Sequence, residues 1–143
     1  ETLPILNNLT NEQFEKLLDI CTKHELPSFT VLHKEGDESI DMYILTRGEL
    51  KVILHGEEIN RIFPISTVGE MGIFTGEARS ATIISISKCT LLRIMKKDLF
   101  GLFAKDKDFH IKFQEGMLLD LSQKIRMTNE IILKLQSKLK AFR

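Results

Sequence analysis

An unbroken stripe of core-type residues near the end of the chain most constrains the fold. Its members recur at alternating spacings of three and four residues, as in the seam of a coiled coil, and they are Leu118, Leu121, Ile125, Thr128, Ile132, Leu135, Leu139 and Phe142. A helix of about 30 residues is about 45 Å long, which exceeds the width of a domain of 143 residues. The stripe therefore predicts a parallel homodimer through this helix, and packing on the chain's own sheets is the alternative.

Composition sets limits on the class of protein. Twenty Lys and Arg residues balance twenty Asp and Glu residues, so the excess of positive charge typical of nucleic-acid binding is missing. No apolar run reaches the length of about 20 residues that crosses a bilayer, and we expect a cytoplasmic protein without a membrane partner. Cys21 and Cys89 show no metal-binding pattern and are expected to be reduced, buried thiols. The histidines lack ligand spacing as well, so no metal or cofactor is expected.

A helix is predicted near the start of the chain. Thr10 and Gln13 have the spacing of a capping box, and Phe14, Leu17, Leu18 and Cys21 follow at helical spacing. We expect this helix to continue through His24, to end before Pro27, and to pack its apolar face on a sheet.

Short strands with regular turns follow. The segments 42–46 and 49–54 are expected to form one hairpin about Arg47-Gly48, and 81–86 and 90–95 a second about Ser87-Lys88. Ile59, Arg61 and Phe63 alternate as another strand, and a short helix is expected from Lys97 to Phe103. Strands without intervening helices indicate a mainly β fold with flanking helices, an antiparallel sandwich or jelly roll. We divide the chain into a β-roll with an N-terminal helix (1–105) and a long C-terminal helix (106–143), which together form one domain unit.

Two polar stretches are candidate ligand sites. The acidic residues Glu35, Asp37, Glu38 and Asp41 lack the alternating spacing and closing glutamate of a calcium loop, so calcium binding is rejected.

The second stretch, G-E-M-G-I-F-T-G-E-A-R-S-A-T at 69–82, is a stronger candidate. Gly69 and Gly72 let backbone N–H groups approach an anion, and a helical turn beginning at Met71 would direct its amides at it. Arg79 adds a planar cation, whereas Glu70 can accept hydrogen bonds from hydroxyl groups. A nucleotide satisfies both halves.

This stretch resembles the phosphate-binding cassette of cyclic-nucleotide-binding domains. The run G-E-M-G-I-F is most similar to the effector domain of the cAMP receptor protein (CRP/FNR-like) family, and E-G-D-E-S-I-D-M-Y-I-L-T-R-G-E-L-K-V resembles the family's glycine-marked strands. The resemblance implies that Arg79 grips the phosphate, that Ser80 assists through its hydroxyl and N–H, and that Glu70 binds the ribose 2′-hydroxyl. It also implies that the C-terminal helix is a dimerisation helix.

The base contact is carried over from the same resemblance. The run K-I-R-M-T-N-E at 124–130 resembles the family's stretch in which a Thr-Ser pair contacts adenine. Thr128 would then accept from the adenine amino group in its own subunit, while Asn129 would reach across the dimer in place of serine. For Thr128, a hydrogen bond to its own helix backbone is the alternative. The amide of Asn129 also suits guanine, and the Ser80 hydroxyl could serve a guanine amino group, so cGMP is the alternative to cAMP.

The expected function is a homodimeric cyclic-nucleotide sensor, most favourably for cAMP, that is part of or derived from a CRP-like transcription regulator. No nucleophile, base and orienting group recur at recognisable spacing, so an enzyme is not expected. The alternatives are a ligand-free dimerisation scaffold of the same fold and a sensor of cGMP or a cyclic dinucleotide. DNA binding would need a segment that is absent from these 143 residues.

Overall fold

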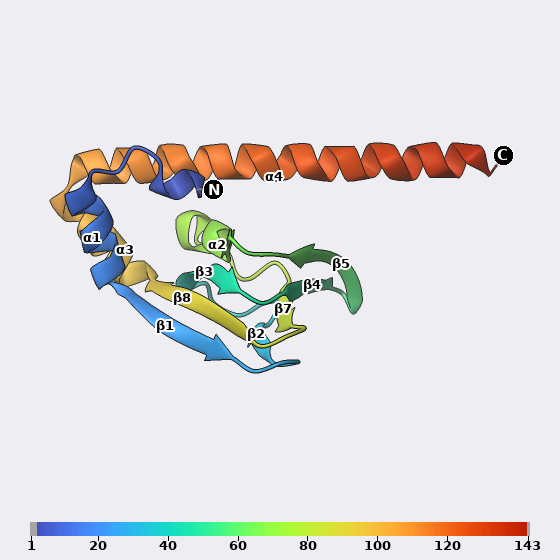
Figure 1. The fold of residues 1–143 in the computed structure, drawn as a ribbon, viewed down its shortest axis with the longest axis horizontal. Coiled ribbons are helices and arrows are strands. Elements are labelled where there is room, and N and C mark those ends of the chain that lie inside the picture. Colours follow the sequence, from blue (N-terminus) through green and yellow to red (C-terminus); the bar gives the residue numbers. More distant parts are fainter. Residues whose placement is uncertain (1–2, 143) are drawn as a thin grey trace.

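The computed structural model describes residues 3–142. Two layers of strands lie on one side of the molecule, and a long helix runs along the other (Figure 1). One sheet has the strand order β1 (Cys21–Leu26), β8 (Cys89–Met95), β3 (Asp41–Arg47) and β6 (Ser66–Val68). The other has the order β2 (Val31–His33), β7 (Thr82–Ser85), β4 (Leu50–Leu54) and β5 (Glu57–Ile62). All neighbouring strands are antiparallel, which confirms the predicted jelly roll.

Both predicted hairpins are wrong, although their strands and turns exist. β3 and β4 lie in different sheets, and so do β7 and β8. The turn at Gly48 (φ 91°) takes the chain from one sheet to the other, and an added Cβ there would lie 2.4 Å from the Lys88 carbonyl oxygen. The two sheets face each other across a shared core. The apolar residues of the strands on either side of each turn are therefore buried even though these strands do not pair with each other. The hairpin that does form joins β4 to β5.

The first helix is shorter than expected. α1 spans Asn11–Asp19, and its capping box is confirmed by hydrogen bonds between Thr10 and Gln13 in both directions. The residues predicted to form its last turn belong instead to β1, which pairs along its whole length with β8. Cys21 is therefore a half-buried strand residue, not a helical core residue, whereas Cys89 is buried; both thiols are free.

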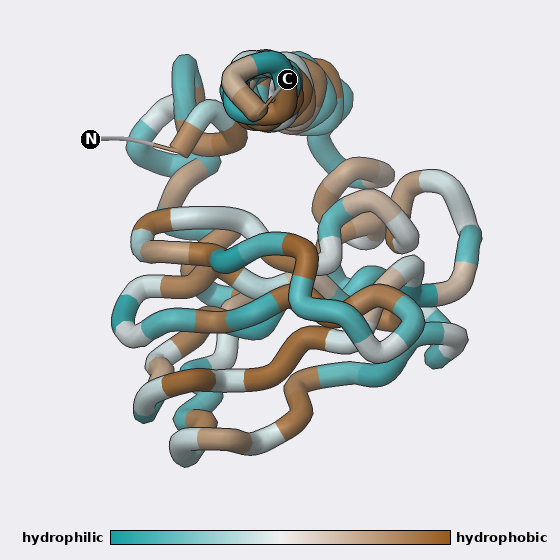
Figure 2. Tube along the Cα trace, turned by 90° about the vertical axis from the view of Figure 1, so that its right-hand side faces the viewer, coloured by the Kyte–Doolittle hydropathy of each residue, from teal (hydrophilic) through white to brown (hydrophobic). Residues whose placement is uncertain are grey.

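Two hydrophobic clusters form the core. One fills the space between the sheets and includes Leu45, Leu50 and Leu91. The other joins the first sheet to the helices, with Leu17 of α1 and Met42 of β3 among its members. Figure 2 looks along the long helix and shows hydrophobic and hydrophilic residues alternating along the strands below it.

An aromatic cluster fixes the helices against one another. α2 spans Glu70–Thr75, α3 spans Lys96–Lys105 and α4 spans Lys107–Ala141, with the Asp106 carboxylate accepting from the Phe109 N–H at the start of α4. The Phe113 ring is fully buried, and its centroid lies 5.6 to 6.2 Å from those of Phe74, Phe103 and Phe109. α4 also packs on the short helix η1 (Pro4–Leu6), where Gly116 lies against the backbone of Pro4 and Ile5.

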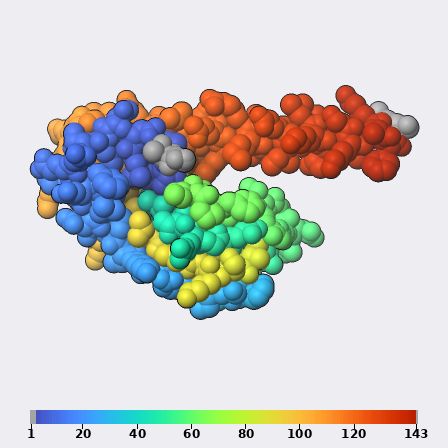
Figure 3. Space-filling model, in the orientation of Figure 1, coloured from blue at the N-terminus to red at the C-terminus, as the bar shows by residue number. Residues whose placement is uncertain are grey.

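α4 has two different faces. Phe113, Met117 and Asp120 are buried toward the roll, whereas the members of the predicted seam at 118, 125, 132, 135 and 139 are 46 to 69% exposed. At about 100° per residue, the seam lies about a quarter turn from the buried face. The later part of the helix projects beyond the roll (Figure 3). The alternative that the seam packs on the chain's own sheets is therefore wrong.

Within residues 3–142, none of the helices combines the length and the apolar character that a bilayer span requires.

We predict that Phe113→Ala lowers the free energy of unfolding by about 3 to 5 kcal/mol, because it leaves a cavity among closely packed rings. Phe29→Ala is the control, since Phe29 is 76% exposed in the loop between β1 and β2 and its loss should change stability by less than about 0.5 kcal/mol. Urea denaturation of both variants measures the difference. Equal effects would show that the aromatic cluster does not anchor α4.

Candidate functional site

A cavity of about 630 Å³ lies between the roll, α2 and the middle of α4. Seven of the eight predicted ligand-binding residues line it, namely Gly69, Glu70, Met71, Gly72, Arg79, Ser80 and Thr128. Asn129 is exposed and is not part of the lining. The fold therefore brings together one glycine-rich segment and one helix face that are about 50 residues apart in the sequence.

Glycine at position 69 is favoured both by the backbone conformation there and by the close approach of Arg79. It is the residue before α2 and has a φ of 75°, a conformation that favours glycine. A Cβ added to Gly69 would lie 2.5 Å from Nη1 of Arg79, so the missing side chain makes room for the guanidinium. The helical turn predicted for this segment is confirmed as α2.

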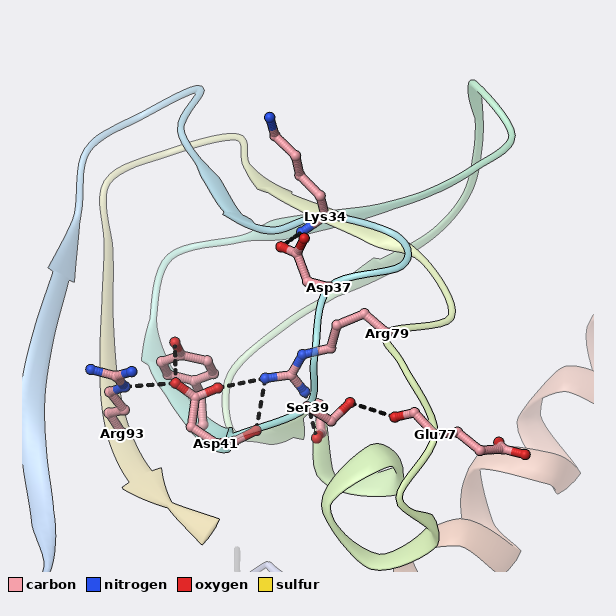
Figure 4. A network of polar contacts seen from close by, with 9 residues as sticks. Lys34, Asp37, Ser39, Asp41, Glu77, Arg79 and Arg93 are labelled. Carbon is pink, nitrogen blue, oxygen red and sulfur yellow. Dashed lines mark hydrogen bonds and ion pairs between the residues drawn. The ribbon is translucent and has the colours of Figure 1, made fainter. Parts of the chain in front are cut away.

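Arg79 is a buried residue, 6% exposed, and its guanidinium is held by hydrogen bonds to two other residues. Nη1 donates to the Gly69 carbonyl (2.9 Å), and Nη2 donates to the Asp41 carbonyl (2.8 Å) and to the Asp41 carboxylate. Nε has no hydrogen-bond partner among the described residues. Figure 4 shows the guanidinium pointing at Asp41.

Asp41 is the anchor of this network. Its carboxylate also accepts from Nε of Arg93 (2.6 Å) and from the hydroxyl of Tyr43 (3.0 Å). Burial and the adjacent Asp41 raise the pKa of Tyr43 to about 12, so the phenol remains a donor. Two guanidinium groups share one carboxylate, which leaves one positive charge in the network around Arg79.

His33 lies beside the same arginine. Both of its ring nitrogens are buried, and neither makes a hydrogen bond among the described residues. Burial, followed by the charge of Arg79, lowers the pKa of His33 to about 4; Asp41, Asp37 and the backbone of Ala81 oppose the change only partly. The ring is therefore neutral at pH 7, and Arg79 is the cation beside it.

A second charged cluster lies around Lys124, where α2, β6 and α4 line the cavity. Lys124 of α4 donates to Glu70 (2.8 Å), to Asp120 (3.1 Å) and to the hydroxyl of Thr67 (2.9 Å). Burial alone would lower the pKa of Lys124, but the carboxylates of Glu70 and Asp120 raise it overall. Two carboxylates share one ammonium, so this cluster carries one negative charge.

The remaining wall is mostly apolar. Phe63 and Ile65 line it from the segment between β5 and β6, and Met127 and Ile131 line it from α4. The Thr128 hydroxyl donates to the carbonyl of Lys124 (3.0 Å), which is the local bond that the sequence left as an alternative.

Sequence reasoning missed five residues of the site: His33, Asp41, Thr67, Asp120 and Lys124. Asp120 and Lys124 precede Thr128 at spacings of eight and four, so one face of α4 carries all three. That spacing was a usable signal. In the sequence Asp41 belongs only to an acidic cluster, because nothing local reveals its pairing with an arginine 38 residues away.

Comparisons with known proteins agree with this geometry. Residues 23–106 match the profile of the cyclic nucleotide-binding domain family. The chain therefore belongs to this family, and the resemblance seen in its sequence is confirmed at that level.

Relatives of the chain include two proteins of different kinds. It is 24% identical over 127 residues to the cAMP-activated global transcriptional regulator CRP of Salmonella typhimurium, covering 85% of this chain and 59% of the regulator. It is 26% identical over 92 residues to a cGMP-dependent protein kinase of Drosophila melanogaster, covering 64% of this chain and 8% of the kinase. The chain thus spans less than two thirds of the length of either relative.

A solved cyclic nucleotide-binding domain from Methylobacillus flagellatus has the same fold. Its TM-score is 0.84 at 22% identity, over 92% of this chain and 80% of that one.

We predict that acidification from pH 7 to pH 4.5 destabilises the wild type by about 1 to 2 kcal/mol more than His33→Phe. The ordinary pKa of histidine, 6.5, exceeds the folded value of about 4, so the unfolded chain binds the extra proton. The stability that the neutral ring contributes is complete above about pH 6.5 and is lost as the pH falls toward 4. Urea denaturation across this range measures it. Identical pH slopes for the two proteins would contradict the account of His33.

Proposed function

We propose that this domain binds a 3′,5′-cyclic nucleotide, with cAMP preferred, and signals its occupancy through α4. The charged and apolar groups that line the cavity are the observation that supports this proposal. A buried guanidinium, a buried carboxylate pair and an apolar wall line one cavity, and they match the phosphate, ribose and base of one nucleotide.

Each part of the ligand has a partner. The phosphate would lie against Arg79, whose Nε has no other partner among residues 3–142, and against the exposed Ser80. The ribose 2′-hydroxyl would donate to Glu70. The base would lie along Met127 and Ile131, with Thr128 at its edge. Ser80 is also the residue that favours cGMP as the second candidate, because its hydroxyl lies at the cavity where a guanine amino group could reach it.

Homodimerisation through α4 supports the same function. The exposed seam is continuous from Leu118 to Phe142, and its burial against a second copy would remove apolar surface from water. In a parallel pair, residues that flank the seam on opposite sides meet across the interface. Lys124 and Asn129 flank the seam in this way. Asn129 of the partner subunit would therefore approach the cavity of this subunit, although Asn129 does not line the cavity of its own subunit.

Signalling would follow from differential affinity. The nucleotide contacts the roll through Arg79 and α4 through Thr128, so its affinity depends on how α4 lies against the roll. Binding then shifts the population toward one arrangement of the helix pair. We propose a regulatory domain, not an enzyme, of a CRP-like transcription regulator whose DNA contacts are made outside this chain. A dimerisation scaffold with no ligand is the alternative that a titration separates.

We predict that Arg79→Ala weakens cAMP binding about thirtyfold to a thousandfold, since it removes a charge-assisted contact worth roughly 2 to 4 kcal/mol. The variant should fold, because Asp41 keeps Arg93 and Tyr43 as partners. Arg126→Ala is the control, since Arg126 is exposed on α4 outside the cavity lining. Isothermal titration calorimetry measures both. Unchanged affinity in a folded Arg79→Ala protein would refute the site, and absence of binding by the wild type to any cyclic nucleotide would favour the scaffold.

We predict that Ile132→Asp with Leu139→Asp makes the protein monomeric, because carboxylates buried in the seam would lose their hydration. Leu133→Asp with Ser137→Asp is the control, since it adds the same charges to an exposed face away from the seam. Sedimentation equilibrium at micromolar concentration distinguishes them. A dimer that survives the first pair and dissociates with the second would place the interface on the other face.

A further inference from the structure

The charged cluster around Lys124 holds more acceptors than its ammonium has hydrogen atoms. Its Nζ lies 2.8 Å from Glu70, 2.9 Å from the Thr67 hydroxyl, 3.1 Å from Asp120 and 3.3 Å from the Thr67 carbonyl. An ammonium has three N–H donors. One acceptor can therefore be withdrawn without leaving a donor unpaired.

Glu70 is the acceptor that can be withdrawn. The other partners already form a unit, because the Thr67 hydroxyl donates to Asp120 (2.9 Å) and so turns its lone pairs toward the ammonium. Asp120 lies one helical turn before Lys124 on α4. Thr67 is 1% and Asp120 6% exposed, so water does not compete for this unit.

We propose that Asp120, supported by Thr67, is a positioning residue that holds Lys124 when the ribose hydroxyl of a nucleotide engages Glu70. This inference rests on the proposed function and adds to it a residue with no assigned role in binding. Without Asp120, Lys124 would depend on Glu70, and the ribose would have to compete with an ammonium for the same carboxylate.

The exchange also links the ligand to the long helix. Glu70 belongs to α2, whereas Lys124 and Asp120 both belong to α4. Because Lys124 already pairs with Asp120 (3.1 Å), losing the Glu70 contact removes the ion pair between α2 and α4 and leaves the one within α4. Ribose binding would thus loosen the tie between α2 and α4 while leaving the tie to β6 through Thr67.

The test compares cAMP with 2′-deoxy-cAMP, which lacks the hydroxyl. Asp120→Asn also removes a negative charge that acts on the phosphate, but that effect is the same for both ligands and cancels in the ratio of their Kd values. We expect the wild type to favour cAMP, and the preference to fall about fivefold or more in Asp120→Asn. Thr67→Val is nearly isosteric and should also lower the preference for cAMP over 2′-deoxy-cAMP. It serves as the test if Asp120→Asn does not fold.

Asp108→Asn is the matched control. Asp108 also pairs with a lysine four residues ahead on α4, Lys112 at 2.9 Å, but lies outside the cavity lining. The Asp108→Asn substitution should leave the ratio of the Kd values for cAMP and 2′-deoxy-cAMP unchanged. A wild-type ratio in folded Asp120→Asn and Thr67→Val would overturn the inference while the proposed function stands. Binding of neither ligand by the wild type would instead refute the proposed function and the inference with it.

Discussion

The buried pair between Arg79 and Asp41 is the interaction on which the site depends. A buried guanidinium without a partner is very costly, so Asp41 makes it possible to hold Arg79 behind the cavity. Arg93 and Tyr43 share the same carboxylate, which prevents Asp41 from cancelling the positive charge of the network. β3 and β8 supply these partners from the centre of the first sheet. The two central strands of this sheet thereby orient the group that is proposed to bind the phosphate.

α4 connects the site to the exterior of the molecule. Its first turns are locked by the aromatic cluster around Phe113, its middle lines the cavity with Lys124 and Thr128, and its end projects with an exposed seam. A helix is stiff along its length, so a small change at Lys124 is carried to the residues beyond it. In our account, this arrangement lets a polar exchange inside one subunit affect how two subunits meet.

The sequence predicted the jelly roll and the long helix from local patterns, and it predicted seven of the residues that line the cavity from the glycine-rich segment together with the family resemblance. The glycines and Arg79 lie in one short segment, and the seam follows the helical repeat. The sheet partners could not be predicted in this way, since β3 and β4 look like a hairpin whether they pair or face each other across a core. The predicted first helix is too long because Cys21 continues its apolar spacing, whereas pairing with β8 makes Cys21 part of a strand. Asp41 was missed because its role exists only after the chain has folded.

A crystal structure of the domain grown with cAMP tests the central claim most directly. Our account predicts the phosphate against Arg79 and Ser80, the ribose 2′-hydroxyl within hydrogen-bond distance of Glu70, and Lys124 held by Asp120 and Thr67. A nucleotide bound elsewhere on the domain, or one that leaves Arg79 bound only to Asp41 and Gly69, would contradict it.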